Sequence, residues 1–124
     1  MRLTDEIFLD IDVDYEEFIK NHFDELQRQI DVVEKQYNIT TKAIRKSSSG
    51  RVHIALVIPG RKDLDIVNQF DLMSIRAFLG DDEARILADL RRYFISRDYG
   101  HVNRIFDHKF KKGKAWTAGP WVMF

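Results

Sequence analysis

Residues 6–14, "EIFLDIDVD", decide which fold the sequence predicts. Apolar and acidic side chains alternate along this stretch, so that one face is aliphatic and the other carries Asp10 and Asp12. A period of two residues is typical of a β-strand that buries one face. We therefore predict a strand over about 6–13, with helices against its aliphatic face and an open aspartate face. Asp14, at the end of this strand, is expected to cap the helix that follows.

The rest of the sequence predicts a split β-α-β arrangement around this strand. An apolar stripe at helical spacing predicts a long helix over 15–37, and the serine–glycine turn at 47–50 separates strands at 39–46 and 51–58. Two helices and a last strand follow, at 63–79, 82–96 and 103–110. The expected fold is α+β with the ferredoxin-like, RRM-like topology βαββ(αα)β. Its antiparallel sheet has the strand order 4-1-3-2, with the helices on one face.

Composition restricts the class of protein. The chain has 124 residues, no cysteine, a formal net charge of zero and 44% hydrophobic residues. It is long enough for one core, so we expect a single domain over 1–124. The lack of cysteine fits the cytoplasm. No apolar run approaches about 18 residues and the first residues do not resemble a signal peptide, so we expect no membrane association.

The charges are unevenly distributed along the chain. Basic side chains concentrate in 41–60 and 101–124, while the first third of the sequence is mainly acidic. This asymmetry favours an anionic partner near the basic segments, although an ordinary solvated surface has the same composition. The last segment, 111–124, is a basic and aromatic tail whose Trp116 and Trp121 suit base stacking or packing against protein.

The strand faces bring a set of polar residues together on the open face of the sheet. His53 lies opposite in parity to the bulky residues of its strand, and so joins the aspartates. If the phenylalanines of 103–110 face the helices, Asp107 joins them as well. The expected cluster is Asp10, Asp12, His53 and Asp107. Carboxylates on neighbouring strands suit Mg²⁺ or Mn²⁺, and these ions support phosphoryl and nucleotidyl transfer.

Three motifs resemble those of archaeo-eukaryotic primases and primase-polymerases, and they occur in that family's order. "IFLDIDVD" at 7–14 is similar to the first motif, "KSSSGRVHIAL" at 46–56 to the second, and "RIFDHKF" at 104–110 to the third. The resemblance spans about 6–110. It implies a minimal RRM-like catalytic core that carries out metal-dependent nucleotidyl transfer in DNA replication or repair.

The resemblance also implies a role for each matched residue. The catalytic set is Asp10, Asp12, His53 and Asp107, of which the three aspartates hold Mg²⁺ or Mn²⁺. The nucleotide-binding set is Ser47, Ser49, Arg51, His53 and Lys109, with either Ser47 or Ser49 as the motif serine. The implied partners are nucleoside triphosphates and DNA or RNA. The short chain also allows a partner subunit or a homodimer.

Two other functions fit the same sequence. A non-catalytic RRM-like nucleic-acid-binding or adaptor protein would use the aspartates only to protect an edge strand. A metal-dependent nuclease is the third possibility, because "FDHK" at 106–109 resembles the Asp-x-Lys half of restriction-type nucleases. Elsewhere, "GDD" at 80–82 is expected to be a helix stop and a cap. Arg85, Asp89 and Arg92 are expected to form a solvated helix face.

Overall fold

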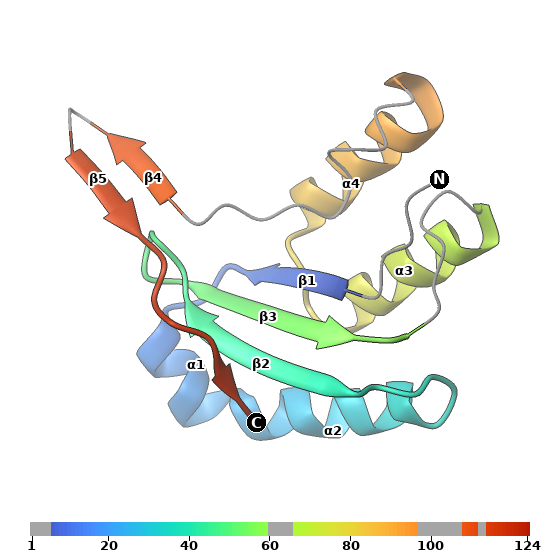
Figure 1. Ribbon diagram of the computed structural model, residues 1–124, viewed down its shortest axis with the longest axis horizontal. Coiled ribbons are helices and arrows are strands. Elements are labelled where there is room, and N and C mark those ends of the chain that lie inside the picture. Colours follow the sequence, from blue (N-terminus) through green and yellow to red (C-terminus); the bar gives the residue numbers. More distant parts are fainter. Residues whose placement is uncertain (1–5, 60–65, 97–107, 112–113) are drawn as a thin grey trace.

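The structure, a computed structural model, describes residues 6–59, 66–96, 108–111 and 114–124 (Figure 1). The predicted α+β class is confirmed, because helices pack on a four-stranded antiparallel sheet. The elements are β1 Glu6–Ile11, α1 Tyr15–Asn21, α2 Phe23–Glu34, β2 Thr41–Lys46, β3 Val52–Val57, α3 Ile66–Phe78, α4 Glu83–Arg91, the π-helical segment η1 Arg92–Ser96, β4 His108–Lys111, β5 Lys114–Thr117 and β6 Val122–Met123.

The centre of the sheet follows the predicted split arrangement. The strand order is β1-β3-β2-β6, so the first and third strands are neighbours although a helical segment and β2 separate them in sequence. The register places Asp10 opposite His53 on one side of β3 and Arg45 opposite His53 on the other. The tail adds the short strand β6 at the outer edge of β2. The register therefore aligns three polar residues in one row across the sheet.

One face of the sheet is apolar and buried and the other is polar and more exposed, as predicted. On β1, Ile7, Leu9 and Ile11 are buried, whereas the alternate residues are more exposed. The buried residues join one core with apolar side chains of the helices, namely Phe18, Leu26, Ile30, Leu72 and Ile75. Burial of each large aliphatic side chain contributes about 1.5–3 kcal/mol. Helices α1, α2 and α3 therefore cover the aliphatic face, and the aspartates lie on the other face.

The predicted long helix over 15–37 is broken at His22. This residue ends α1 and begins α2, and its φ of −126° lies outside the helical region. The change of direction is accompanied by an edge-on contact between the rings of Phe18 and Phe23, whose centroids are 6.3 Å apart. The predicted cap is confirmed, because the Asp14 side chain accepts a hydrogen bond from the Glu17 N–H at 3.3 Å.

The prediction that a fourth strand lies beside β1 is wrong for the residues of that strand that the structure describes. Residues 108–111 form β4, which pairs with β5 in a separate two-stranded sheet, and the remainder of 103–110 lies outside the described residues. The outer edge of β1 instead meets the turn between α3 and α4. Asp10 N–H donates to Asp81 Oδ1 at 2.7 Å, and Asp82 N–H donates to the Asp10 carbonyl at 2.9 Å. These bonds use backbone groups that a neighbouring strand would need.

Candidate functional site

A row of three polar side chains crosses the face of the sheet opposite to the helices. Arg45 Nε donates to His53 Nδ1 at 3.0 Å, and His53 Nε2 lies 3.8 Å from Asp10 Oδ1. Because Nδ1 accepts a hydrogen bond, a neutral His53 ring carries its proton on Nε2, which faces Asp10. Arg45 and His53 are buried, while 40% of the Asp10 side chain is exposed. The structure thus brings together Asp10 and His53, as their parities predict.

Asp10 and His53 form a non-hydrogen-bonded pair of the antiparallel ladder between β1 and β3. Both backbone groups of Asp10 are directed away from β3, toward Asp81 and Asp82. Residues with outward-facing backbone groups form the non-hydrogen-bonded pairs of a ladder, in which facing side chains are closest. The register therefore holds the carboxyl group and the imidazole near one another without any bend in the strands.

Asp12 and Arg51 extend this row toward one end of the sheet. Asp12 follows directly after β1, and its Oδ1 lies 3.4 Å from Arg51 Nε, at the start of β3. The Asp12 side chain is 79% exposed and the Arg51 side chain 47%. Two carboxylates and two nitrogen-bearing side chains therefore gather at one end of β1 and β3. This end is the one at which the first two sequence motifs meet.

The serine turn before β3 is built by one of its two candidate serines. The buried Ser47 accepts a hydrogen bond from Arg51 N–H through its Oγ at 3.0 Å, and Gly50 N–H donates to the Ser47 carbonyl. Gly50 has a φ of +82°, a conformation that favours glycine. Ser49 is exposed, and its Oγ lies 3.2 Å from the Ser47 Oγ. Ser47 thus maintains the turn, and Ser49 presents a hydroxyl group at its surface.

The other predicted site residues are not brought to this row by the described part of the structure. Asp107 lies outside the described residues, so the structure does not place it. Lys109 lies in β4, where its backbone is opposite Trp116 in the separate hairpin. The proposed third metal ligand and the lysine contact therefore stay predictions from the sequence.

Burial and charged neighbours of both signs act on the Asp10 carboxyl group. Burial is the largest cause that raises the pKa of Asp10 above its usual value, and Arg85 opposes this effect. Asp81, Asp82 and Asp12 each raise the pKa of Asp10 further, because like charges disfavour its ionised form. A cation bound beside Asp10 would offset this repulsion.

A buried network of charges lies behind Asp10, and the sequence analysis missed it. Arg76 is fully buried; its Nε donates to Asp81 Oδ2 at 2.6 Å and its Nη1 to Asp89 Oδ2 at 2.7 Å. Arg85 Nη1 donates to the same Asp81 oxygen at 2.7 Å. The expected solvated helix face is therefore wrong for Asp89, which is 1% exposed, and for Arg85, whose side chain is 12% exposed, whereas the Arg92 side chain is 42% exposed. Charge-assisted hydrogen bonds offset part of the cost of removing these groups from water, while the buried Arg76 Nη2 has no hydrogen-bond partner among the described residues.

This network positions Asp10 through the turn at 80–82. Asp81 uses one carboxylate oxygen for the two arginines and the other for the N–H groups of Asp10 and Asp82. The expected roles of the turn are confirmed as well. Gly80 has a φ of +90° after the end of α3, and the Asp82 side chain caps α4 by accepting from Ala84 N–H. The "GDD" turn is thus a helix stop, a helix cap and a support for Asp10.

The donor set fits a divalent ion of the magnesium type in part. Asp10 and Asp12 share one face, and both carboxyl groups reach solvent. Mg²⁺ is usually bound by one or two carboxylates together with water and substrate phosphates. Among the residues that the structure describes, no group of three acidic or histidine side chains could hold a metal ion by itself. A divalent ion at Asp10 and Asp12 would need further oxygen ligands to complete its coordination.

The aspartate face is less open than expected, because the tail crosses it. The guanidinium carbon of Arg45 lies 4.4 Å from the centroid of the Trp121 ring. The rings of Trp121 and Phe8 are 6.5 Å apart and inclined by 33°. Trp121 therefore lies over the middle of this face and contributes to the burial of the row beneath it.

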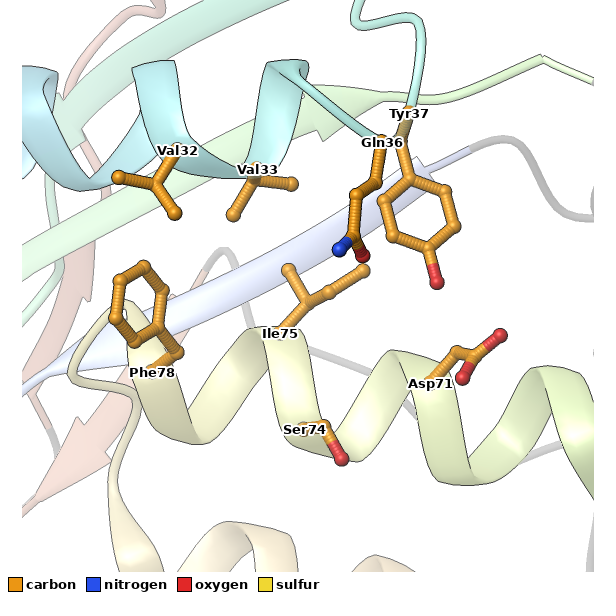
Figure 2. A pocket seen from close by; sticks show the side chains of 8 residues that line it. All are labelled: Val32, Val33, Gln36, Tyr37, Asp71, Ser74, Ile75 and Phe78. Atoms are coloured by element: carbon orange, nitrogen blue, oxygen red, sulfur yellow. The ribbon is translucent and has the colours of Figure 1, made fainter.

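A groove on the opposite side of the sheet does not belong to this site. It has a volume of about 260 Å³ and lies between α2 and α3 (Figure 2). Its lining residues are Val32, Val33, Gln36, Tyr37, Asp71, Ser74, Ile75 and Phe78. Because α2 and α3 pack on the aliphatic face, the sheet separates this groove from Asp10 and His53.

Comparisons with protein-family models, with curated proteins and with solved structures find no match to this chain. Within the described ranges, none of the helices combines the length and the apolar character needed to cross a membrane.

Proposed function

We propose that this chain is a minimal, cytoplasmic primase-polymerase-like domain that transfers nucleotides in a metal-dependent reaction on nucleic acid. The observation that carries the proposal is the row at the end of β1 and β3. There, Asp10 faces His53 and Asp12 faces Arg51. Carboxylates for a cation thus lie beside donors for phosphate, which is the pairing that phosphoryl and nucleotidyl transfer require.

Each residue of the row has a defined part in this proposal. Asp10 and Asp12 hold Mg²⁺ or Mn²⁺, with Asp107 as the further ligand that the family resemblance implies. The ion supplies charge neutralisation and alignment of phosphate oxygens. His53 Nε2–H and the Arg51 guanidinium donate hydrogen bonds to the triphosphate of the incoming nucleotide. Arg45 fixes the His53 tautomer in which Nε2 is the donor.

The serine turn completes the phosphate site. Ser49 is the motif serine in this proposal, because it is exposed while Ser47 is buried within the turn. A serine hydroxyl group and backbone N–H groups in a tight turn commonly contact phosphate oxygens. We expect Ser49→Ala to raise the KM for the nucleotide with little change in kcat. Ser47→Ala, by contrast, should lower stability, because Arg51 N–H loses its acceptor.

The proposal is tested by incubating the protein with a primed template, nucleoside triphosphates and Mn²⁺ or Mg²⁺. We expect incorporation by the wild type and its loss in both Asp10→Asn and Asp12→Asn. Asp31→Asn is the matched control, because it makes the same change in charge on the exposed surface of α2. Strand cleavage without incorporation would indicate the nuclease. Nucleic-acid binding without either activity would indicate the adaptor.

A further inference from the structure

We propose that Trp121 is a stacking platform for an unpaired base of single-stranded nucleic acid on the non-helical face of the sheet. The inference rests on the proposed function in that it takes nucleic acid as the partner. It extends that function by assigning the place where the strand lies. It concerns a segment of the tail that none of the three motifs includes.

Backbone hydrogen bonds hold the chain both before and after Trp121. Before it, Gly119 N–H donates to the Lys46 carbonyl at 2.8 Å. After it, β6 pairs with β2, and Phe124 N–H donates to the Lys42 carbonyl at 3.0 Å. A ring that is fixed before binding loses little conformational entropy when a ligand stacks on it. The backbone of this segment is therefore suited to present a rigid aromatic surface.

The two faces of the ring differ in their surroundings. Arg45 lies 4.4 Å below the ring, and Arg45 is itself anchored by its bond to His53. Trp121 is nevertheless 37% exposed, and Phe8 lies beside it at 6.5 Å. Bases of any sequence stack on such aromatic surfaces, because every base has a π-face. The geometry thus combines a supported inner face with an outer face that reaches solvent.

One basic side chain lies on the same face as Trp121, at the end of the sheet nearest the serine turn. Arg51 immediately precedes β3, and its side chain is 47% exposed. It is paired with the exposed carboxylate of Asp12. Such a surface pair contributes little free energy, so that the Arg51 guanidinium is able to turn toward phosphate. This charge favours nucleic acid over an apolar protein surface as the occupant.

The position of Trp121 links the strand to the row beneath it. Arg45 contacts the Trp121 ring and donates to His53, which faces Asp10. A base on Trp121 therefore lies one layer above the residues that the proposed reaction uses. Stacking requires an unpaired base, so the expected ligand is a single strand rather than a duplex.

The test uses the full chain with Trp116→Phe, which leaves Trp121 as the only tryptophan. A fluorescently labelled thymidine oligonucleotide of about 12 nucleotides is titrated in EDTA, and Trp121 emission and oligonucleotide anisotropy are both recorded. An abasic oligonucleotide of the same length carries the phosphates without bases. We expect the thymidine strand to quench Trp121 and to bind at least about tenfold more tightly than the abasic strand.

Two substitutions at the platform complete the test. Trp121→Leu should weaken binding of the thymidine strand to the level of the abasic strand, whereas Trp121→Phe should retain intermediate affinity. If Trp121→Leu does not fold, the Trp121→Phe result decides. Equal binding of both strands, or unchanged binding by the variants, would overturn the proposal.

The metal-free conditions separate this proposal from the proposed function. Strand binding in EDTA without nucleotide incorporation in Mn²⁺ would support the platform and contradict the transferase. Incorporation with no base-dependent binding would support the transferase and contradict the platform. A protein ligand in place of nucleic acid would show itself as the absence of binding to either oligonucleotide, which also overturns the platform.

Discussion

Two groups of charged side chains meet at Asp10, and they differ in burial and in how closely their charges are paired. On the inner side, Arg76 and Asp81 are fully buried and are joined at 2.6 Å. On the outer side, the Asp10 carboxyl group is partly exposed, and its oxygen lies 3.8 Å from the His53 nitrogen, beyond hydrogen-bonding distance. The inner group is closed by short charge-assisted hydrogen bonds, while the charges of the outer group are farther apart and partly exposed. The difference indicates that the inner group supports the structure and the outer group is suited to a ligand.

The connection between the two groups runs through the backbone. Asp81 accepts from Asp10 N–H, and Asp82 N–H donates to the Asp10 carbonyl. A side chain at a functional site needs such support, because small displacements of a metal ligand or a catalytic group lower activity strongly. The inner network therefore fixes the backbone of Asp10, from which its carboxyl group projects.

The largest expected effect is the loss of Arg76. Arg76→Met removes the partner of two buried carboxylates, Asp81 and Asp89, and should lower the free energy of unfolding by about 3–5 kcal/mol. Urea denaturation measures this loss. Arg28→Met is the matched control, because Arg28 makes an equally short ion pair with Glu25 at the surface, at 2.7 Å. We expect no measurable change for the control, and similar losses for both variants would contradict the proposed difference between the two groups.

The next effect has the opposite sign. Asp10→Asn should stabilise the metal-free protein at neutral pH, because burial and neighbouring carboxylates disfavour the ionised form of Asp10. The gain should be smaller than the loss expected at Arg76, since Asp10 is partly exposed. A clear loss of stability would show that the Asp10 carboxylate is held by contacts that outweigh this repulsion.

The same effect has a defined dependence on pH. A carboxyl group with a raised pKa in the folded state binds its proton more tightly when folded. Its contribution to stability is therefore greatest below the unfolded pKa, near 3.8, and is lost as the pH rises through the folded pKa. The stabilities of the wild type and Asp10→Asn should converge at low pH and separate as the pH rises. Denaturation midpoints measured across this range test the sign.

The smallest effect is expected at Asp12. Its side chain is 79% exposed and pairs only loosely with Arg51, at 3.4 Å. Asp12→Asn should change the free energy of unfolding by no more than about 0.5 kcal/mol without metal. Thermal denaturation of the metal-free variant measures this change. A large effect would place Asp12 with the inner group rather than with the outer one.

The sequence was sufficient to predict the centre of the fold. Strict alternation on β1 and the serine–glycine turn predicted three adjacent strands and the face that the helices cover. For the described residues 108–110, the position of the fourth strand was mispredicted, because hydrogen bonds from Asp82 and Arg85 to the edge of β1 have no local sequence signature. The break at His22 was missed for a similar reason, since neither glycine nor proline marks it.

The sequence predicted the candidate site only where alternation along a strand determines the face on which a residue lies. Parity placed Asp10 and His53 on one face, and the structure pairs them across β1 and β3. The buried network needed a different signal, which the sequence does contain. Arg76 lies within an apolar stripe of α3, between Leu72 and Leu79, and a charge at such a position requires a buried partner.

We propose above that Asp10 and Asp12 together bind a divalent cation. The most direct measurement is the melting temperature of the wild type, Asp10→Asn/Asp12→Asn and Asp31→Asn as Mn²⁺ is added. Binding to the folded state alone stabilises by about 2.7 kcal/mol at a concentration of 100 times Kd. We expect a rise in melting temperature for the wild type and Asp31→Asn, and none for the double variant. No rise in the wild type, or an equal rise in the double variant, would contradict the claim.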